Sequence, residues 1–346
     1  MKTEEFLRRV TALPGVTGNE RAAAMFIADA FRPFVDEVVV TSLNSVIAHK
    51  KGAGPKVMVC AHLDEIGMMV SKIEKDGSLR LQSVGGVDPR VLPGMRVRVF
   101  AGDGEMMGVV GATPPHLMRE ADRKNNYTFE TLFVDLGLPA EEVEKKVRIG
   151  DTVCFEHRYV ELKGGKVACK TVDDRGCVAI MLQAAKRLEK MHHDADLYFV
   201  ATCQEEIGSY GAMTAGFQVD PDFGVAFDVC HAETPGAPRL YTNKIDSLVA
   251  SKGPFLHPYL VKRLEKTAKE NGVQLQIAID PRWTSTDADD LSLVRNGVPT
   301  VLLSLPIKYM HTNVETFDMH ALEEGGRLLA HYLSEMDASW EDELWN

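Results

Sequence analysis

The stretch VMVCAHLDE, residues 57–65, joins an apolar run to a histidine and two acids. A short run of apolar residues bounded by polar ones predicts a strand that is buried on both faces. In an open α/β sheet, ligands bind where such strands end. The stretch therefore predicts a buried strand that places His62 and Asp64 at the edge of a sheet, where a site can form.

Four further segments place acids or a histidine beside or after apolar residues. They are KTVDDRG with Asp173 and Asp174, LYFVATCQEE with Glu205 and Glu206, FGVAFDV with Asp228, and LPIKYMHT with His311. Two histidines and several carboxylates that converge at strand ends have the composition of a site for two divalent metals. This pattern is typical of a metallohydrolase.

The composition is that of an ordinary globular protein, with 45% apolar and 26% charged residues in a chain of 346. The net charge of −11 argues against nucleic acid as a partner, because phosphate backbones need clustered Lys and Arg. No apolar stretch reaches the length of a membrane span, and the first ten residues lack the apolar core of a signal peptide. The six cysteines are dispersed, as in reducing compartments. We expect a cytoplasmic protein with no membrane partner.

The chain begins with two expected helices followed by three strands, and after Lys170 strands alternate with helices, which predicts an α/β domain with a three-layer sheet. The expected strands cover residues 35–42, 45–52, 56–65, 196–202, 223–229, 273–279 and 298–306. Thr17 and Glu20 have the spacing of a capping box before a helix at 21–31. Asp174 is a candidate N-cap of a second helix, and Asp318 begins the last one. We assign residues 1–66 and 167–346 to this domain.

The middle of the chain has a different sequence pattern. Between residues 67 and 166, short β-rich runs are broken by DG, GG and GDG turns. Several short strands with such turns predict a small barrel or sandwich. We therefore expect an inserted all-β domain.

A pair of metals that act together needs one carboxylate to bridge both ions and another, without a metal, to act as general base. Glu205 and Glu206 are adjacent, so on an extended backbone they point in opposite directions. One of them can bind metal while the other faces the attacking water. Asp64 lies two residues after His62 and can orient its imidazole.

Five of these motifs, in this order, resemble the M42 family of metallo-aminopeptidases, which includes glutamyl aminopeptidase and the tetrahedral TET aminopeptidases. The motifs are HLDEIGMMV, DDRG, QEEIGSYGA, DVCHAETPG and YMHTNVE, and PPHL and VRIGDTV extend the resemblance into the middle block. The resemblance covers nearly the whole chain. It implies a phosphorylase/hydrolase-like α/β catalytic domain with an inserted barrel-like domain that mediates assembly, from a dimer up to a tetrahedral dodecamer.

The resemblance also implies a role for each matching residue. His62, Asp173 and Asp228 would hold one divalent ion, and Asp173, Glu206 and His311 the other, with Asp173 as the bridge. Glu205 would be the general base, and a cis peptide would join Asp173 to Asp174. Zinc, cobalt and manganese suit such ligands.

The chain departs from the family pattern beside the expected substrate pocket. Ser209 and Tyr210 stand where many members have a bulky aliphatic residue and an Arg, and Ser285, Asp289 and Asp290 replace smaller residues. Asp289 and Asp290 would favour a basic first residue if they entered the pocket, but they could equally face solvent. By resemblance Asp287 lines the cleft. His116 and His231 are candidates for either the site or a structural role.

The function that these observations favour is the removal of N-terminal residues from peptides. A metal-dependent deacylase or carboxypeptidase could use the same site. A glycosidase would need two carboxylates and no metal. A non-catalytic scaffold with this fold would lack ligands, whereas here all five ligands and the base are present. The preferred N-terminal residue stays open.

Overall fold

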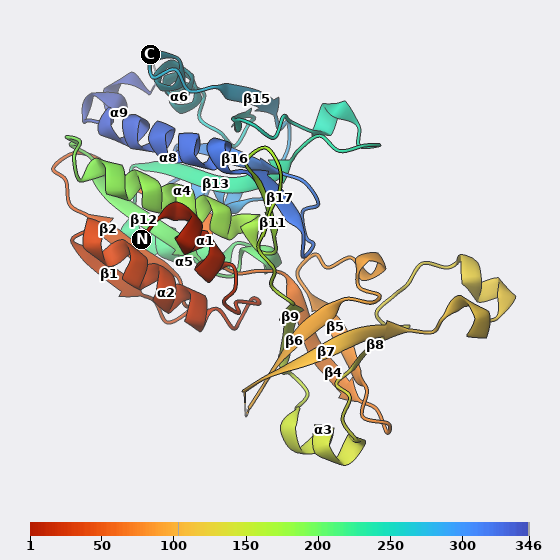
Figure 1. The fold of residues 1–346 in the computed structure, drawn as a ribbon. Helices are drawn as coiled ribbons and strands as arrows, with labels where there is room; N and C mark the ends of the chain where they lie inside the picture. Colours follow the sequence, from red (N-terminus) through yellow and green to blue (C-terminus); the bar gives the residue numbers. More distant parts are fainter. Residues whose placement is uncertain (103, 345–346) are drawn as a thin grey trace.

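The computed structural model describes residues 1–102 and 104–344. Its centre is an eight-stranded sheet in the order β1-β2-β12-β3-β13-β16-β14-β15 (Figure 1). The strands are β1 (Glu37–Val40), β2 (Val46–Lys50), β3 (Lys56–His62), β12 (Asp196–Thr202), β13 (Phe223–His231), β14 (Leu248–Lys252), β15 (Leu275–Ile279) and β16 (Thr300–Ile307). The central strands β12, β3, β13 and β16 are parallel, so their carboxyl ends meet at one edge of the sheet.

Helices cover both faces of the sheet and give the expected three layers. One face packs on α1 (Thr3–Val10), α2 (Arg21–Phe31), α4 (Val172–Leu188), α6 (Pro258–Glu270) and α8 (Met319–Ser334), and the other on α5 (Tyr210–Val219) and α7 (Asp287–Ser292). The alternation along β3 shows this division, because Val57 and Val59 belong to the first core while Met58 and Cys60 belong to the second. A short C-terminal helix, α9 (Ser339–Glu343), adds Trp340 to the first core.

The middle of the chain forms a closed six-stranded barrel, as the short strands and turns predicted. Its strands are β4 (Gly67–Ile73), β5 (Leu79–Val84), β6 (Arg96–Ala101), β7 (Gly104–Ala112), β8 (Leu132–Asp135) and β9 (Thr152–Phe155), in the order β4-β5-β8-β7-β6-β9. The barrel has an apolar core of its own, to which α3 (Ala140–Lys146) contributes Val143. It lies beyond one end of the sheet domain (Figure 1).

A second sheet has three strands, two directly after the barrel and one near the end of the chain. It contains β10 (Val160–Glu161), β11 (Lys166–Cys169) and β17 (Glu315–Asp318) in the order β10-β11-β17. The pairing of β11 with β17 brings the segment before α4 next to the segment before α8. Within the described residues, no helix is long and apolar enough to span a bilayer.

Helices α2 and α8 begin where the sequence predicted, but the two predicted caps at Thr17–Glu20 and Asp174 are not formed. Asp318 also caps α8, because its carboxylate accepts the backbone N–H groups of His320 and Ala321. The predicted capping box does not form. The Thr17 hydroxyl donates to Asp64 Oδ2 at 2.7 Å and does not cap α2, and no other side chain caps this helix. Asp174 is not an N-cap either, because its buried carboxylate accepts the backbone N–H of His62 at 3.2 Å. In both cases a tertiary contact replaces the local one.

Candidate active site

The register of the parallel strands places several of the acids next to His62. Thr202, at the end of β12, pairs with His62, at the end of β3, so the two glutamates that follow β12 begin beside this histidine. Ala226 of β13 pairs with Cys60, which puts Asp228 level with His62. The site therefore forms at the carboxyl edge of the sheet, where the apolar runs predicted it.

Two further segments complete the site from outside the sheet. Asp173 lies at the start of α4, and His311 lies between β16 and β17. The peptide bond between Asp173 and Asp174 is cis, as the family resemblance implies. Thr171 and His311 have positive φ angles of 63° and 62°, an uncommon conformation for residues other than glycine that is often found at functional sites.

The carboxylate of Asp173 lies between the two histidines. Its Oδ1 is 2.9 Å from Nε2 of His62, and its Oδ2 is 3.2 Å from Nε2 of His311. Burial alone would raise the pKa of Asp173, but the hydrogen bonds from His311 and His62 outweigh it and lower the pKa. A carboxylate that presents one oxygen to each of two imidazoles has the arrangement needed to bridge two cations.

The remaining acids surround these three residues. The ligand atoms of His62, Asp173 and Glu206 lie within 4.8 Å of one another, and so do those of His62, Asp174 and Asp228. Nε2 of His311 is 3.6 Å from a carboxylate oxygen of Glu206. The structure thus brings together all five candidate ligands that the family resemblance implied. The carboxylate of Asp174 lies next to them, near His62 and Asp228.

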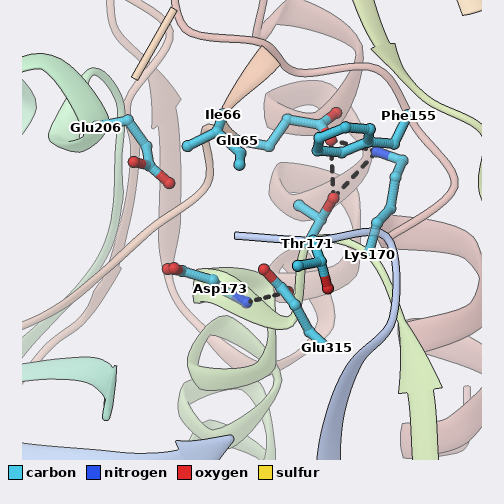
Figure 2. A pocket seen from close by; sticks show the side chains of 9 residues that line it. Glu65, Ile66, Phe155, Lys170, Thr171, Asp173, Glu206 and Glu315 are labelled. Atoms are coloured by element: carbon cyan, nitrogen blue, oxygen red, sulfur yellow. Dashed lines mark hydrogen bonds and ion pairs between the residues drawn. The ribbon is translucent and has the colours of Figure 1, made fainter. Parts of the chain in front are cut away.

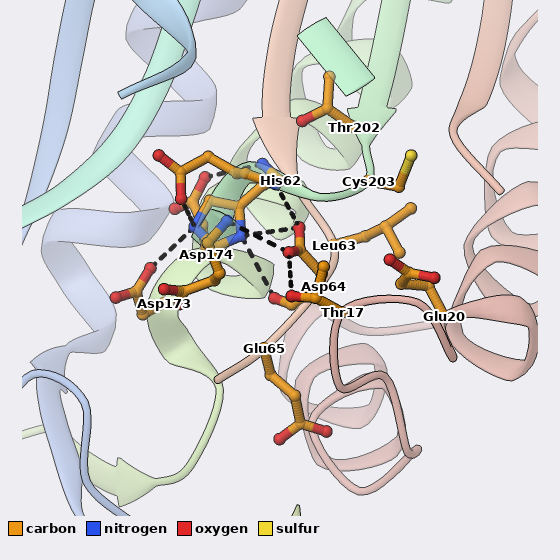
Figure 3. Close-up of polar contacts among 12 residues, drawn as sticks. Thr17, Glu20, His62, Leu63, Asp64, Glu65, Asp173, Asp174, Thr202 and Cys203 are labelled. Atoms are coloured by element: carbon orange, nitrogen blue, oxygen red, sulfur yellow. Dashed lines mark hydrogen bonds and ion pairs between the residues drawn. The ribbon is translucent and has the colours of Figure 1, made fainter. Parts of the chain in front are cut away.

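Asp64 lies underneath this cluster and is completely buried. Its carboxylate accepts the Thr17 hydroxyl (Figure 3). It also accepts backbone N–H groups from Glu205 at 3.1 Å and Glu206 at 3.3 Å. Nδ1 of His62 lies 3.2 Å from the Asp64 carbonyl oxygen and 3.5 Å from its Oδ1. Asp64 therefore connects the imidazole to the backbone of both glutamates.

The electrostatics of the cluster fit a site for cations. Burial, together with the charges of Asp228, Asp287 and Asp173, raises the pKa of Glu205 to about 9 against the opposing effect of His62. Burial also raises the pKa of Glu206 and Asp228 well above their usual range. Carboxylates packed so closely cannot all be ionised without a compensating charge. Oxygen and imidazole donors in this number suit divalent ions such as zinc, cobalt or manganese.

Glu315 is a buried acid that the sequence did not single out, although it ends the motif YMHTNVE. Its carboxylate accepts backbone N–H groups from Val172 at 2.7 Å, Asp173 at 3.1 Å and His311 at 3.1 Å. It therefore joins the segments that carry two of the candidate ligands. Only its place at the end of the motif could have pointed to it.

A second feature that the sequence did not predict is the buried ion pair of Glu65 and Lys170 beside the site (Figure 2). Lys170 Nζ contacts the carboxylate of Glu65 and donates to the Thr171 hydroxyl at 3.0 Å. Between this pair and Asp173, Glu206 and Glu315 lies a cavity of about 10 Å³, which is space for one water molecule. No local sequence pattern predicts such a pair, because its partners are 105 residues apart.

The acids expected near the substrate pocket lie in different environments. The carboxylate of Asp289 is buried and accepts N–H groups from Thr284 and Ser285, so it holds a loop in place and does not face a pocket. Asp290 is half-buried. Asp287 is buried with one oxygen unpartnered, accepts the Thr202 hydroxyl, and burial raises its pKa to about 6.

The two remaining histidines of the sequence analysis are both exposed. His116 lies in a short 3-10 turn, η3 (Pro115–Leu117), which follows β7 of the barrel. His231 is the last residue of β13, three positions beyond Asp228. Neither belongs to the groups of ligand atoms described above.

The fold and the site together define a hydrolase of the peptidase class. Residues 44–328 match the family model described as M42 glutamyl aminopeptidase. The chain is 38% identical to a lysyl aminopeptidase from Pyrococcus furiosus over 337 residues, which cover 96% of this chain and 97% of that protein. The chain belongs to the M42 family.

Solved structures agree with this membership. A TET aminopeptidase from a marine sediment archaeon of the Thaumarchaeota has a TM-score of 0.95 and 27% identity, covering 99% of this chain and 98% of that one. The TET1 peptidase of Pyrococcus horikoshii, which can assemble into a tetrahedron or a large octahedral shell, has a TM-score of 0.85 and 29% identity, covering 97% and 100%. The family and these relatives support aminopeptidase activity, and membership of a metallopeptidase family implies divalent metals.

Proposed function

We propose that this protein is an aminopeptidase that uses two divalent metal ions per subunit to remove N-terminal residues from peptides. The observation that carries the proposal is the position of Asp173, which presents one carboxylate oxygen to His62 and the other to His311. Asp228 and Glu206 lie close enough to supply further oxygens to the two halves of the site.

In this proposal each ion has three protein residues. His62, Asp173 and Asp228 would hold one ion, and Asp173, Glu206 and His311 would hold the other. Zinc, cobalt and manganese all accept this mixture of imidazole and carboxylate donors. Bound cations would supply Lewis acidity, which polarises the scissile carbonyl and makes the attacking water more acidic.

Glu205 is the proposed general base. Its carboxylate oxygen is 3.8 Å from Nε2 of His62, and its side chain keeps 12% of its surface exposed, so it lies at the cluster and is still reached by solvent. It would take the proton of the attacking water and pass it to the leaving nitrogen. The Asp64 carboxylate, through the Glu205 backbone N–H, would hold the base in place.

A Glu205→Gln variant tests the assignment of the base. We expect it to bind two ions as the wild type does while kcat falls by about 100- to 10,000-fold, the usual contribution of a general base. Glu141→Gln, at an exposed acid of α3, is the matched control and should be fully active. Wild-type kcat in a metal-loaded Glu205→Gln variant would show that another group takes the proton.

Substrate comparisons separate this function from its alternatives. An aminopeptidase cleaves peptides with a free α-amine and rejects the same peptides after acetylation, whereas a deacylase or carboxypeptidase does not need the free amine. A chelator abolishes any metal-dependent reaction but leaves a two-carboxylate glycosidase active. A set of aminoacyl chromogenic substrates, assayed with zinc, cobalt and manganese in turn, identifies the preferred first residue and metal.

The proposal includes a homo-oligomer in which residues 67–166 act as the assembly domain. The support is the ability of the Pyrococcus horikoshii relative to form closed shells, together with the separate core of the barrel. Multi-angle light scattering would distinguish a dimer from a dodecamer of 38.2 kDa protomers. A monomer at micromolar concentration would refute the assembly.

A further inference from the structure

A glycine turn of the barrel reaches the candidate metal centre. Gly85 and Gly86 follow β5, and the carbonyl oxygen of Gly86 lies 3.1 Å from Nδ1 of His311. A carbonyl can only accept a hydrogen bond, so Nδ1 carries a hydrogen, and in the neutral imidazole that binds a metal ion Nε2 then carries the lone pair. That Nε2 points toward the carboxylates of Asp173 and Glu206, at 3.2 Å and 3.6 Å.

The turn has no space for a side chain at this point. A Cβ atom at Gly86 would lie 2.7 Å from Nδ1 and 2.9 Å from Cε1 of His311, closer than real Cβ contacts come. A Cβ at Gly85 would lie 3.3 Å from the Cβ of Glu206. Gly85 also has a positive φ of 73°, but Gly86 does not require one. The requirement at Gly86 is therefore the close approach of backbone to imidazole.

Contacts between the barrel and the sheet domain fix the position of this turn. Arg98 of β6 donates to the carbonyl oxygen of Ala12 at 2.7 Å, and Asn19 donates to the hydroxyl of Thr152 in β9 at 2.9 Å. The Arg98 side chain is mostly buried. The barrel is thus held against the sheet domain by polar contacts as well as by the chain itself.

We propose that the barrel is part of the metal centre, because the Gly86 carbonyl holds His311 in the tautomer and orientation that bind the second ion. This inference rests on the proposed two-metal function. Outer hydrogen-bond partners of this kind orient ligand histidines, and their loss typically weakens metal binding by 10- to 100-fold. Gly86 is a positioning residue, since it touches a ligand and not the substrate.

The test compares Gly86→Ala with a control from the same barrel, Gly102→Ala. A Cβ at Gly102 would meet no described atom within 4 Å, so the control adds the same methyl group without a clash. Both variants and the wild type would be titrated with zinc against a competing chelator, after removal of metal, and melted in the metal-free state.

We expect two tight zinc sites in the wild type and in Gly102→Ala, but at least tenfold weaker binding at one site of Gly86→Ala. The other site should bind within about twofold of the wild type. Wild-type affinity at both sites of Gly86→Ala would overturn the inference. Fewer than two sites in the wild type itself would instead overturn the proposed function, so the two failures differ.

A second measurement does not depend on how Gly86→Ala folds. In wild-type enzyme loaded with cadmium-113 and labelled with nitrogen-15 histidine, the ring of His311 is assigned from a His311→Gln sample. We expect the hydrogen on Nδ1 and the metal coupling on Nε2. The hydrogen on Nε2, or coupling through Nδ1, would overturn the inference.

Discussion

Replacement of Lys170 by methionine should destabilise the protein by several kilocalories per mole. The Lys170 side chain is 1% exposed and that of its partner Glu65 is 3% exposed, so neither charge is solvated by bulk water. Glu65 comes three residues after His62, and Lys170 comes three residues before Asp173. Their ion pair therefore joins the chain where it leaves the sheet domain for the barrel and where it returns.

The size of the effect follows from the charge that remains. Removal of one partner of a buried ion pair typically costs about 3–5 kcal/mol, because the other charge stays buried. Without Lys170, Glu65 would keep the hydrogen bond from the Thr171 hydroxyl. It would also keep the positive charge of Arg175, whose Nη2 is 3.9 Å from Oε1 of Glu65. These partial substitutes place the expected loss near the lower limit, at about 3 kcal/mol. An additional Glu65→Gln change should restore part of it by removing the unpaired charge.

The assay is equilibrium unfolding in urea of the metal-free protein, followed by circular dichroism at neutral pH. Lys252→Met is the control, because its ion pair with Glu265 is at the surface and is worth less than about 1 kcal/mol. A loss in Lys170→Met no larger than in Lys252→Met would refute the reasoning. A double variant no more stable than Lys170→Met would also refute it, since the unpaired carboxylate would not be the cause.

Three other predictions concern the acids of the site. Asp64→Asn replaces an acceptor of two backbone N–H groups by an amide, so kcat on chromogenic substrates should fall about 10- to 100-fold; unchanged kcat would contradict its supporting role. Glu315→Ala leaves three backbone N–H groups without their acceptor and should cost at least about 3 kcal/mol in urea unfolding, whereas wild-type stability would contradict the contacts. Burial raises the pKa of Glu205 from 4.5 to about 9 and that of Asp287 from 3.8 to about 6. The metal-free folded state then holds protons that the unfolded chain releases, so its melting temperature should fall as the pH rises from about 4 to 9; a melting temperature that rises over this range would contradict the shifts.

The strands and most of the site could be predicted because they follow from local patterns. A polar residue at the end of an apolar run of strand length reaches the site if the neighbouring parallel strands end at the same edge of the sheet. The register of β3, β12 and β13 meets that requirement, as His62 and Asp228 show. His311 differs, because it lies in a loop beyond β16 with a positive φ, and its prediction depended most on the family motif.

The parts that could not be predicted depend on contacts between distant segments. Thr17 and Glu20 have the spacing of a capping box, but the Thr17 hydroxyl has a stronger acceptor in the buried carboxylate of Asp64. The sequence left Asp289 open between the substrate pocket and solvent, and in the structure its oxygens accept backbone N–H groups of a loop instead. In each case the side chain forms hydrogen bonds, as its residue type predicts, but the tertiary structure determines its partner.

The insertion point of the barrel explains why these distant contacts gather at one place. The barrel strands begin at Gly67, shortly after His62, and the chain returns to α4 just before Asp173. A displacement of the barrel would therefore shift the ends of both segments that carry proposed ligands, and would shift His311 through its contact with Gly86. The Glu65–Lys170 pair opposes such a displacement, because it ties the outgoing and returning segments together. A barrel with these attachments cannot move independently of the proposed metal ligands.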